Sequence, residues 1–429
     1  MSNLGLNLNS RIVAVDVLNA VLNKEQRLET SFSGSLLGKG LCDQDRAFSR
    51  QLIFTTLRRL GQIDDLISKS LLHPKKKISG KIQNLMRVGV CQLVFLRTND
   101  YAAISTTVDL AKSSQFKVST GLINAVLRRV QRDSEVVVKS QDKEQLNTPG
   151  WLWSSWKKFY GEEKTRAIAQ AHMLEPLLDL SFKDEPGGDL IRLNGIILPW
   201  GTVRCKVSGE ITNLPGFREG RWWVQDSASR IAVKLLGNVK GKTVVDMCAA
   251  PGGKTLFLAN LGAKVIAIDI SKERLTNLTK NLSRLNLNAE VIEADGINWR
   301  PTKKVDYVLL DAPCSSTGII RRHPDVAHLK KARSIKTLAS TQLKLLESAS
   351  KILSGSGAIL FCTCSLQYEE GVGLVKSFLE KHPDFKLDKI SGTEVFRKEN
   401  HSGVFQSLPS DFRDLGGVSG FFAARLKRK

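Results

Sequence analysis

The sequence predicts a chain of several domains, with an all-helical N-terminal region, a small α/β region and a C-terminal α/β domain built on a parallel sheet. Its 429 residues suffice for two or three domains. Apolar side chains recur at helical spacing at the N-terminus, whereas after Gln225 apolar runs of strand length alternate with helical segments. We therefore expect domains at residues 1–145, 146–225 and 226–429, the last with a sheet covered by helices on both faces.

The balance of charges favours an anionic partner. Lys and Arg number 64 against 42 Asp and Glu, a formal net charge of +22, and nucleic acid is the usual partner of so basic a protein. The seven cysteines form no Cys-x-x-Cys pair, so neither a disulfide framework nor a metal site is indicated, and free thiols suit the cytoplasm. No segment approaches the ~18 apolar residues of a membrane span, and the N-terminus lacks the pattern of a secretory signal.

Helices account for the N-terminal region. In the first of them Val15, Leu18 and Leu22 share one face. Over residues 1–145 there are 22 basic and 13 acidic side chains, and basic pairs such as Arg128-Arg129 recur. Such pairs either face solvent or contact RNA, and their clustering on one helical module leaves both interpretations open. The helices that we expect here are 11–22, 43–60, 82–96, 103–112 and 121–130, with a loop at 74–77.

A helix at 151–173 leads into short strand-like runs between residues 178 and 224, which we interpret as a small α/β subdomain. The C-terminal domain then alternates strands with helices. The expected strands are 243–247, 264–268, 290–293, 307–310, 358–362 and 421–426, and the expected helices are 254–261, 272–285, 340–353 and 370–382.

A glycine-rich loop follows the first of these strands. The spacing in Cys248-Ala-Ala-Pro-Gly-Gly-Lys254 is neither that of a Walker A loop nor that of Gly-x-Gly-x-x-Gly. No phosphate group is therefore implied. Gly252 and Gly253 let backbone N–H groups approach a ligand, and a carboxylate on that ligand would be stabilised by the start of the following helix.

Two acids fit the same ligand. Asp269 ends the second strand, where a carboxylate can accept hydrogen bonds from ribose hydroxyls. Asp295 follows the third strand and could accept from an adenine amine. Acids at the ends of adjacent strands, beside a glycine-rich loop, predict S-adenosylmethionine as the cofactor, since a hydride-transfer enzyme would not need the thiols that lie nearby in the sequence.

Two cysteines follow strands beside another acid. The segment 308–318 opens with the buried strand expected at 307–310, which is followed by Asp311 and Cys314, and a later apolar run ends in Cys362-Thr-Cys364. Methylation at C5 of a pyrimidine needs a thiolate that adds to C6, a base for the C5 proton, and a group near N3 or N4 that accepts developing charge. Cys364, Cys314 and Asp311 are residues of the types that these three roles need. Cys362 would face the same side of a strand as Cys364, so the pattern does not separate them.

These motifs resemble those of the cytosine-C5 RNA methyltransferases, specifically the bacterial RsmB (Sun/Fmu) family of small-subunit rRNA enzymes. The likeness covers nearly the whole chain. Leu57-Arg-Arg-Leu-Gly61 and Leu122-Ile-Asn-Ala-Val-Leu-Arg-Arg129 resemble the NusB-like N-terminal domain of that family. The other motifs that carry the resemblance are Cys248 to Lys254, Asp311-Ala-Pro-Cys-Ser-Ser316, Thr363-Cys-Ser365 and Gly420-Phe-Phe-Ala423.

The resemblance implies a NusB-like RNA-binding domain, a small RRM-like subdomain that also binds RNA, and a Rossmann-like class I methyltransferase domain. It implies a monomeric cytoplasmic enzyme that methylates C5 of a specific cytosine in 16S rRNA, free or partly assembled into the small subunit. Cys364 would be the nucleophile and Cys314 would assist product release. Lys254 would reach the catalytic pocket or serve only the structure of the loop. The cofactor-binding residues that it implies are Cys248, Ala249, Ala250, Pro251, Gly252, Gly253, Lys254, Asp269, Asp295 and Asp311.

The chain departs from the family pattern in two places, which bear on the lining of the pocket. Leu366-Gln-Tyr-Glu-Glu-Gly371 stands where the family tends to have Pro-Glu-Glu-Asn, and Ser419 stands where it usually has Asp.

Two alternative functions remain open. One is that of a tRNA cytosine-C5 methyltransferase, which the N-terminal domain argues against. The other is that of a non-catalytic ribosome assembly factor, which the complete set of thiols and acids argues against. Arg321-Arg-His-Pro324 is expected to contact phosphate or to face solvent.

Overall fold

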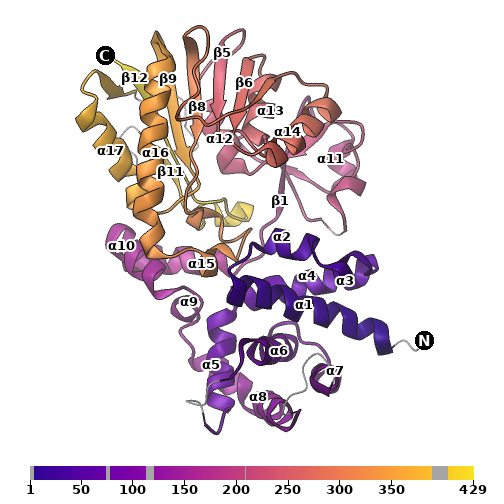
Figure 1. The fold of residues 1–429 in the computed structure, drawn as a ribbon. Helices are drawn as coiled ribbons and strands as arrows, with labels where there is room; N and C mark the ends of the chain where they lie inside the picture. The colour runs from indigo at the N-terminus through magenta and orange to yellow at the C-terminus, as the bar shows by residue number, and fades with distance from the viewer. Residues whose placement is uncertain (1–3, 74–77, 113–119, 208, 389–403) are drawn as a thin grey trace. The chain divides into compact units, whose positions relative to one another are not determined.

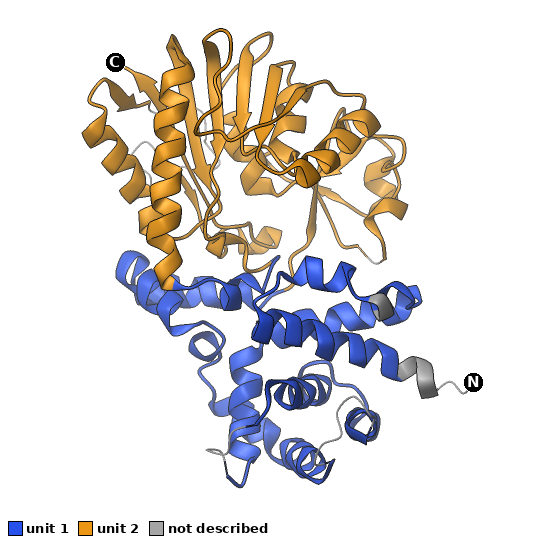
Figure 2. Ribbon diagram, in the orientation of Figure 1, with its two compact units in different colours: residues 1–174, 322–331 blue, residues 175–321, 332–429 orange. Residues whose placement is uncertain are grey.

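The computed structural model divides the chain into two compact units (Figure 2). One comprises residues 1–174 with 322–331, and the other comprises residues 175–321 with 332–429. No helix in the described part of the chain combines the length and apolar composition needed to span a membrane. The residues that the structure describes are 4–73, 78–112, 120–207, 209–388 and 404–429.

The first unit is all helical (Figure 1). Its core follows helical spacing, as in α8, where Ile123, Val126, Leu127 and Val130 are buried on one face. The expected helices are all present, and the expected loop at 74–77 lies outside the described residues. The helices of this unit are α1 (Leu4–Lys24), α2 (Leu28–Ser33), α3 (Leu36–Lys39), α4 (Asp43–Arg58), α5 (Leu60–Ser70), α6 (Gly80–Val90), α7 (Asp100–Lys112), α8 (Thr120–Ser140), α9 (Lys143–Leu146), α10 (Gly150–His172) and α15 (Val326–Leu329).

Two expectations about these helices need correction. The helix expected at 43–60 ends at Arg58, because Arg59 leaves helical geometry (φ −111°, ψ 16°), and α5 then begins at Leu60. The helix expected at 82–96 continues past Val90 as a π-helical turn, Cys91–Phe95. The domain boundary at residue 145 stays a prediction, although packing groups α10 with the N-terminal helices.

A short segment from the C-terminal half of the sequence belongs to the helical unit. The Asp325 carboxylate accepts a hydrogen bond from the backbone N–H of Leu28 at 3.1 Å, and the ring of His328 hydrogen-bonds the carbonyl of Leu57 at 3.1 Å. The chain thus leaves the second unit after Arg321, adds α15 to the helical unit and returns at Ala332. No local sequence pattern indicates this exchange.

The second unit begins with a small antiparallel sheet of order β2-β3-β1-β4. Its strands are β1 (Leu178–Phe182), β2 (Ile196–Ile197), β3 (Val203–Cys205) and β4 (Trp222–Val224), with α11 (Asp189–Arg192) after β1. This is the strand order of a β-α-β-β-α-β fold, with a 3₁₀ turn, Ile211–Asn213, in place of its second helix. The predicted α/β subdomain is therefore present.

One face of this small sheet is closed by the rest of its own unit. The buried Arg204 donates to both carboxylate oxygens of Asp179, at 2.6 and 2.8 Å, and to the carbonyls of Leu415 and Gly417, both at 2.6 Å. The hydroxyl of Ser227 also donates to Asp179, at 2.6 Å. Any RNA contact by the subdomain must therefore use a surface other than this face.

An eight-stranded sheet organises the remainder of the second unit. Its order is β10-β12-β9-β8-β5-β6-β7, with β11 paired to β12. Pairing is parallel from β7 through β9, whereas β12 runs antiparallel to β9, β10 and β11. The strands are β5 (Thr243–Met247), β6 (Lys264–Asp269), β7 (Glu290–Glu293), β8 (Val305–Asp311), β9 (Leu353–Thr363), β10 (Phe385–Leu387), β11 (Val404–Ser407) and β12 (Phe421–Arg428).

Alternating side chains fill a core on each face of this sheet. Val244, Leu309 and Leu360 pack with α12 (Ser227–Lys234), α13 (Gly253–Asn260) and α14 (Lys272–Leu285). Val245 and Phe361 pack on the opposite face with α16 (Ala332–Ile352) and α17 (Val372–Lys381). Figure 1 shows the two sets of helices on opposite sides of the strands. The predicted doubly covered α/β domain is confirmed, although its sheet is mixed rather than parallel throughout.

Candidate active site

The functional motifs meet where the strand order reverses. The strands β5, β6 and β7 extend to one side of the sheet, and β8 and β9 extend to the other. Ligands of open α/β sheets bind outside the carboxyl ends of the strands at such a point. The loops that start at Cys248, Asp311 and Cys364 follow β5, β8 and β9. Topology therefore brings together motifs that lie as far apart in the sequence as Cys248 and Cys364.

The loop after β5 is held in an unusual backbone path. Cys248 has φ +63° and Gly252 has φ +109°, values that favour glycine. A Cβ on Gly252 would lie 2.3 Å from Cδ1 of Leu278, so this glycine allows α13 to start close to α14. Burial and neighbouring carboxylates raise the pKa of Cys248 to about 12, which makes it a poor nucleophile at neutral pH.

Asp269 supports this loop from the end of β6. Its side chain is buried, and its two oxygens accept from the backbone N–H groups of Ala250, at 3.1 Å, and Ser271, at 2.9 Å. Arg274 donates to the carbonyl of Ala250 and lies 3.5 Å from Asp269. The acid thus fixes the predicted cofactor loop, and its contact with a ribose stays a prediction.

Asp295, predicted to contact adenine, lies in a turn after β7. One of its oxygens accepts from the backbone N–H of Ile297 at 3.0 Å, and the other accepts from the amide of Asn298 at 2.8 Å. These are the bonds of an ordinary Asx turn. The side chain remains partly exposed at the carboxyl edge of the sheet, where a ligand could share it.

Asp246 is an acid of the site that the sequence analysis missed. It is fully buried one residue before the end of β5 and accepts a 2.6 Å hydrogen bond from the hydroxyl of Thr255 on α13. Its second oxygen, Oδ1, has no hydrogen-bond partner. Burial, with the charges of Asp311 and Asp269 adding to it, raises the pKa of Asp246 to about 7. The sequence signal that could have revealed this residue is an acid inside an apolar run, Val244-Val245-Asp246-Met247.

Lys254 and Asp311 form an ion pair inside the site. The Lys254 ammonium lies 2.6 Å from Oδ2 of Asp311 and 5.2 Å from the ring centroid of Phe421. Burial alone lowers the pKa of Lys254, but the surrounding negative charges, Asp311 foremost, bring it above its ordinary value. The Lys254 ammonium is therefore favoured at neutral pH, and it is directed to Asp311 at the end of β8 although its backbone belongs to the loop after β5.

The two predicted thiols face each other. The sulfur atoms of Cys314 and Cys364 are 3.5 Å apart, and both side chains are partly exposed. The hydrogen bond that they share lowers the pKa of Cys364, whereas that bond, followed by burial, raises the pKa of Cys314 well above its ordinary value. The shared hydrogen bond thus favours the ionised form of Cys364 over that of Cys314.

The surroundings of Cys362 argue against it as the nucleophile. It is fully buried inside β9 and its thiol hydrogen-bonds the carbonyl of Leu310 at 3.5 Å. Burial raises its pKa well above the ordinary value. The strand ends at Thr363, so Cys364 belongs to the following turn. Strand alternation could not distinguish the two cysteines, whereas the end of the strand does.

The segment 321–324 was expected to contact phosphate or to face solvent, and for the side chain of Arg321 both expectations are wrong. Arg321 is buried and donates to the carbonyl of Gly416 at 2.7 Å. Its guanidinium holds the loop before β12 rather than facing a ligand. Nothing in the local sequence distinguishes a buried structural arginine from an exposed one.

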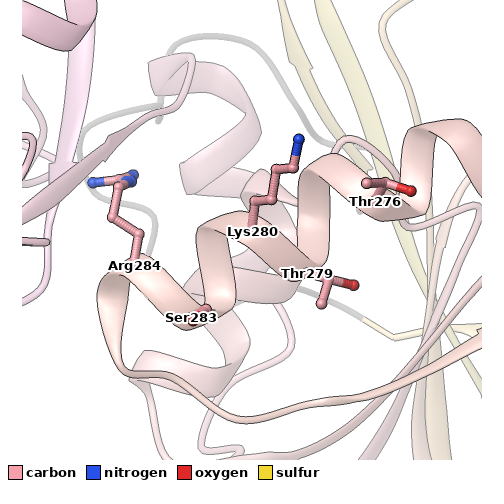
Figure 3. A pocket seen from close by; sticks show the side chains of 5 residues that line it. All are labelled: Thr276, Thr279, Lys280, Ser283 and Arg284. Carbon is pink, nitrogen blue, oxygen red and sulfur yellow. The ribbon is translucent and has the colours of Figure 1, made fainter.

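A surface groove of about 570 Å³ runs along one face of α14. Figure 3 shows its lining of hydroxyl and basic side chains at helical spacing. None of the motif residues contributes to it, so it is distinct from the site at the strand ends. The groove is lined by Thr276, Thr279, Lys280, Ser283 and Arg284.

Among the described residues, His, Cys, Asp and Glu side chains form no group of three or more that could hold a metal ion.

Comparison with known proteins identifies the family. Residues 233–427 match the family model described as 16S rRNA methyltransferase RsmB/F, and residues 8–132 match the NusB family. The protein named ribosomal RNA small subunit methyltransferase B is 32% identical over 437 residues in Photorhabdus laumondii, covering 98% of this chain and 99% of that relative. The chain belongs to the RsmB/F family. The Pseudomonas putida protein of the same name is 33% identical over 441 residues, covering 98% of both chains.

RsmB/F membership confirms the resemblance seen in the sequence, and the NusB match confirms the class of the N-terminal domain. Solved structures agree with the fold. The protein PH0851 has a TM-score of 0.76 at 21% identity, covering 98% of this chain and 99% of its own. A methyltransferase homolog from Pyrococcus horikoshii has a TM-score of 0.54 at 24% identity, covering 69% of this chain and 98% of its own.

Proposed function

We propose that this RsmB/F chain transfers a methyl group from S-adenosylmethionine to C5 of a specific cytosine in 16S rRNA through a covalent bond between Cys364 and C6. The observation that carries the proposal is the thiol pair, with sulfur atoms 3.5 Å apart and the pKa of Cys364 lowered. Both relatives are named ribosomal RNA small subunit methyltransferase B, which favours small-subunit rRNA as the substrate of this chain. The NusB match favours rRNA over tRNA, because the family resemblance includes that domain.

The residues around the thiols suit a cationic nucleoside cofactor. Asp246, Asp269 and Asp311 lie at the ends of adjacent strands, and Oδ1 of Asp246 is buried without a partner. Cys248 to Lys254 would hold the cofactor with Asp269, Asp295 and Asp311. When bound, S-adenosylmethionine supplies an electrophilic methyl group. A positive charge beside these carboxylates would favour their ionised forms, so the donor set fits the cofactor.

The thiol pair provides both the nucleophile and the proton acceptor that the covalent reaction needs. The thiolate of Cys364 adds to C6 of the cytosine, and the electron pair displaced toward C5 makes that carbon nucleophilic. When Cys364 has bonded to C6, Cys314 first releases its own proton to solvent. Its thiolate then takes up the C5 proton after methylation, and the electrons left behind re-form the C5–C6 double bond as the bond from C6 to Cys364 breaks. Lys254 stays charged and counters Asp311, so negative charge can develop beside the thiols.

The target base must leave its stack to reach the two thiols, and a loop cytosine in free or partly assembled small-subunit RNA suits this requirement. The formal charge of +22 favours RNA as the partner. We propose that the enzyme acts in the cytoplasm as a monomer and needs no metal. A non-catalytic assembly role would need no thiol pair of this geometry.

The test uses a denaturing gel with 16S rRNA, cofactor and two variants. Cys314→Ala should attack and transfer methyl but stay bonded to RNA, giving a slow-migrating protein–RNA band. Cys364→Ala should give neither a band nor methylation. A band from Cys364→Ala alone would exchange the two roles, and the lack of a band from both variants would contradict the covalent mechanism. Cys42→Ala, at an exposed thiol of the helical unit, is the matched control and should behave as the wild type.

A further inference from the structure

A carboxylate without a matching cation is buried behind both cysteine loops. Glu370 ends the 3₁₀ turn Tyr368–Glu370, and its side chain is fully buried. Within the described part of the chain no Lys, Arg or His lies within ion-pair distance of it. A buried charge is costly unless donors surround it, so the groups that hold this carboxylate must have a strong influence on local structure.

Four donors satisfy the two oxygens of Glu370. Oε1 accepts from the backbone N–H of Ser315 at 2.9 Å and from the amide of Gln342 at 3.0 Å. Oε2 accepts from the hydroxyl of Ser365 at 2.6 Å and from the hydroxyl of Ser315. Hydrogen bonds to a charged group contribute about 1.5–3 kcal/mol each, roughly twice those between neutral groups.

Two of the residues that donate to Glu370 are the sequence neighbours of the two cysteines. Ser315 directly follows Cys314, and Ser365 directly follows Cys364. A single carboxylate therefore holds the residue next to each thiol. The same turn is tied to the strand as well, because the hydroxyl of Thr363 donates to the backbone carbonyl of Glu370 at 3.1 Å.

Further bonds connect the two loops directly. The backbone N–H of Gly318 donates to the carbonyl of Cys364 at 2.9 Å, and the backbone N–H of Leu366 donates to the hydroxyl of Thr317 at 3.0 Å. The amide of Gln342 reaches the carbonyl of Pro313 at 2.9 Å in addition to Glu370. The two loops are thus braced against each other around a single buried charge.

We propose that Glu370 is a positioning residue for the thiol pair, holding the Cys314 loop and the Cys364 loop so that their sulfur atoms meet. This inference rests on the proposed function of that pair. A second effect follows from the charge. The pKa of Cys314 is raised by its hydrogen bond to Cys364 first, then by burial and by the negative charges of Cys364 and Glu370. The carboxylate therefore helps to keep the proton on Cys314 and the negative charge on Cys364.

The variant Glu370→Gln keeps the shape of the side chain and removes its charge. Gln has one accepting oxygen in place of two, so the hydroxyls of Ser315 and Ser365 could keep their contacts only by accepting from its N–H₂ group, and the charge that strengthens all four bonds is lost. We expect kcat for RNA methylation to fall about 10- to 100-fold, the change that a loss of about 1.4–2.7 kcal/mol of transition-state stabilisation gives. KM for RNA should stay within about twofold, because Glu370 is buried and contacts no substrate.

Alkylation of the RNA-free enzyme provides a readout that a general loss of stability would not produce. Iodoacetamide at pH 7.5, followed by peptide mass spectrometry, measures the modification of Cys364 and Cys314 separately. In the wild type Cys364 should react roughly tenfold or more faster than Cys314, because the thiolate is the nucleophile. In Glu370→Gln this preference should fall to within about threefold. Glu369→Gln, at the exposed neighbour in the same turn, is the matched control and should keep both the preference and kcat.

Ser365→Ala keeps the inference testable if Glu370→Gln does not fold. It removes one hydroxyl from the Cys364 side only, and it should lower kcat while leaving KM unchanged. A folded Glu370→Gln enzyme with wild-type kcat and wild-type alkylation preference would overturn the inference. If the wild type proves inactive on 16S rRNA while Glu370→Gln still loses the alkylation preference, the proposed function fails and the positioning role stands.

Discussion

The buried acid Asp246 makes the stability of the second unit depend on pH. Its pKa is about 7 in the folded protein against an ordinary value of 3.8. Between these values the folded chain retains a proton that the unfolded chain releases, so the free energy of unfolding falls as pH rises through this window and levels off above pH 7. A shift of about three units corresponds to about 4 kcal/mol, of which about 2–3 kcal/mol falls between pH 5 and pH 8.

The variant Asp246→Asn should remove this dependence. Asn cannot ionise, and its carbonyl can still accept the hydrogen bond from Thr255. Its N–H₂ group would lie at the position of Oδ1, which has no partner, at a cost of about 1–3 kcal/mol. That cost is the same at every pH. The variant should therefore be less stable than the wild type at pH 5 and gain about 2–3 kcal/mol relative to it by pH 8.

Urea unfolding of the cofactor-free protein at pH 5, 6, 7 and 8 measures the effect. The relevant transition is the one that added S-adenosylmethionine shifts, since that transition reports the second unit. Glu293→Gln, at an exposed acid on β7, is the control and should follow the wild type. A difference between Asp246→Asn and the wild type that stays constant within about 0.5 kcal/mol from pH 5 to pH 8 would refute the reasoning.

Three further predictions concern substitutions at single residues. Arg204→Met leaves the carboxylate of Asp179 buried without its cation, and urea unfolding should show a loss of about 3–5 kcal/mol; an unchanged midpoint would contradict this. Gly252→Ala meets both a φ of +109° and the side chain of Leu278, so calorimetry should show at least about tenfold weaker cofactor binding; Gly121→Ala, in open space, should not weaken it. Asp269→Ala should weaken cofactor binding by about 1.5–3 kcal/mol, and unchanged affinity in a folded variant would remove it from the cofactor site.

Much of the fold could be predicted from the sequence because its signals are local. The expected strands 243–247 and 290–293 and the helix 272–285 have the observed bounds. Apolar runs of strand length and amphipathic helices repeat with periods that the chain itself fixes. The place of the motifs follows in the same way, since residues after parallel strands must meet at one edge of the sheet. Cys314 after β8 and Cys364 after β9 therefore lie at one edge of the sheet by topology.

The remaining features depend on contacts between distant parts of the chain, which no local period encodes. Strand alternation left Cys362 and Cys364 equivalent, and the point where β9 ends separates them. The helix expected at 340–353 begins at Ala332, where the chain returns from the helical unit.

The chemical state of the site was likewise decided by the tertiary structure. The sequence alone determined which residue types stand after each strand, including the acids and thiols of the motifs. Only the folded chain removed Asp246 from water, placed Glu370 behind two loops and set the sulfur of Cys364 3.5 Å from that of Cys314. A pKa or a buried hydrogen bond depends on what surrounds a group in space, and that surrounding is assembled from segments that the sequence keeps apart.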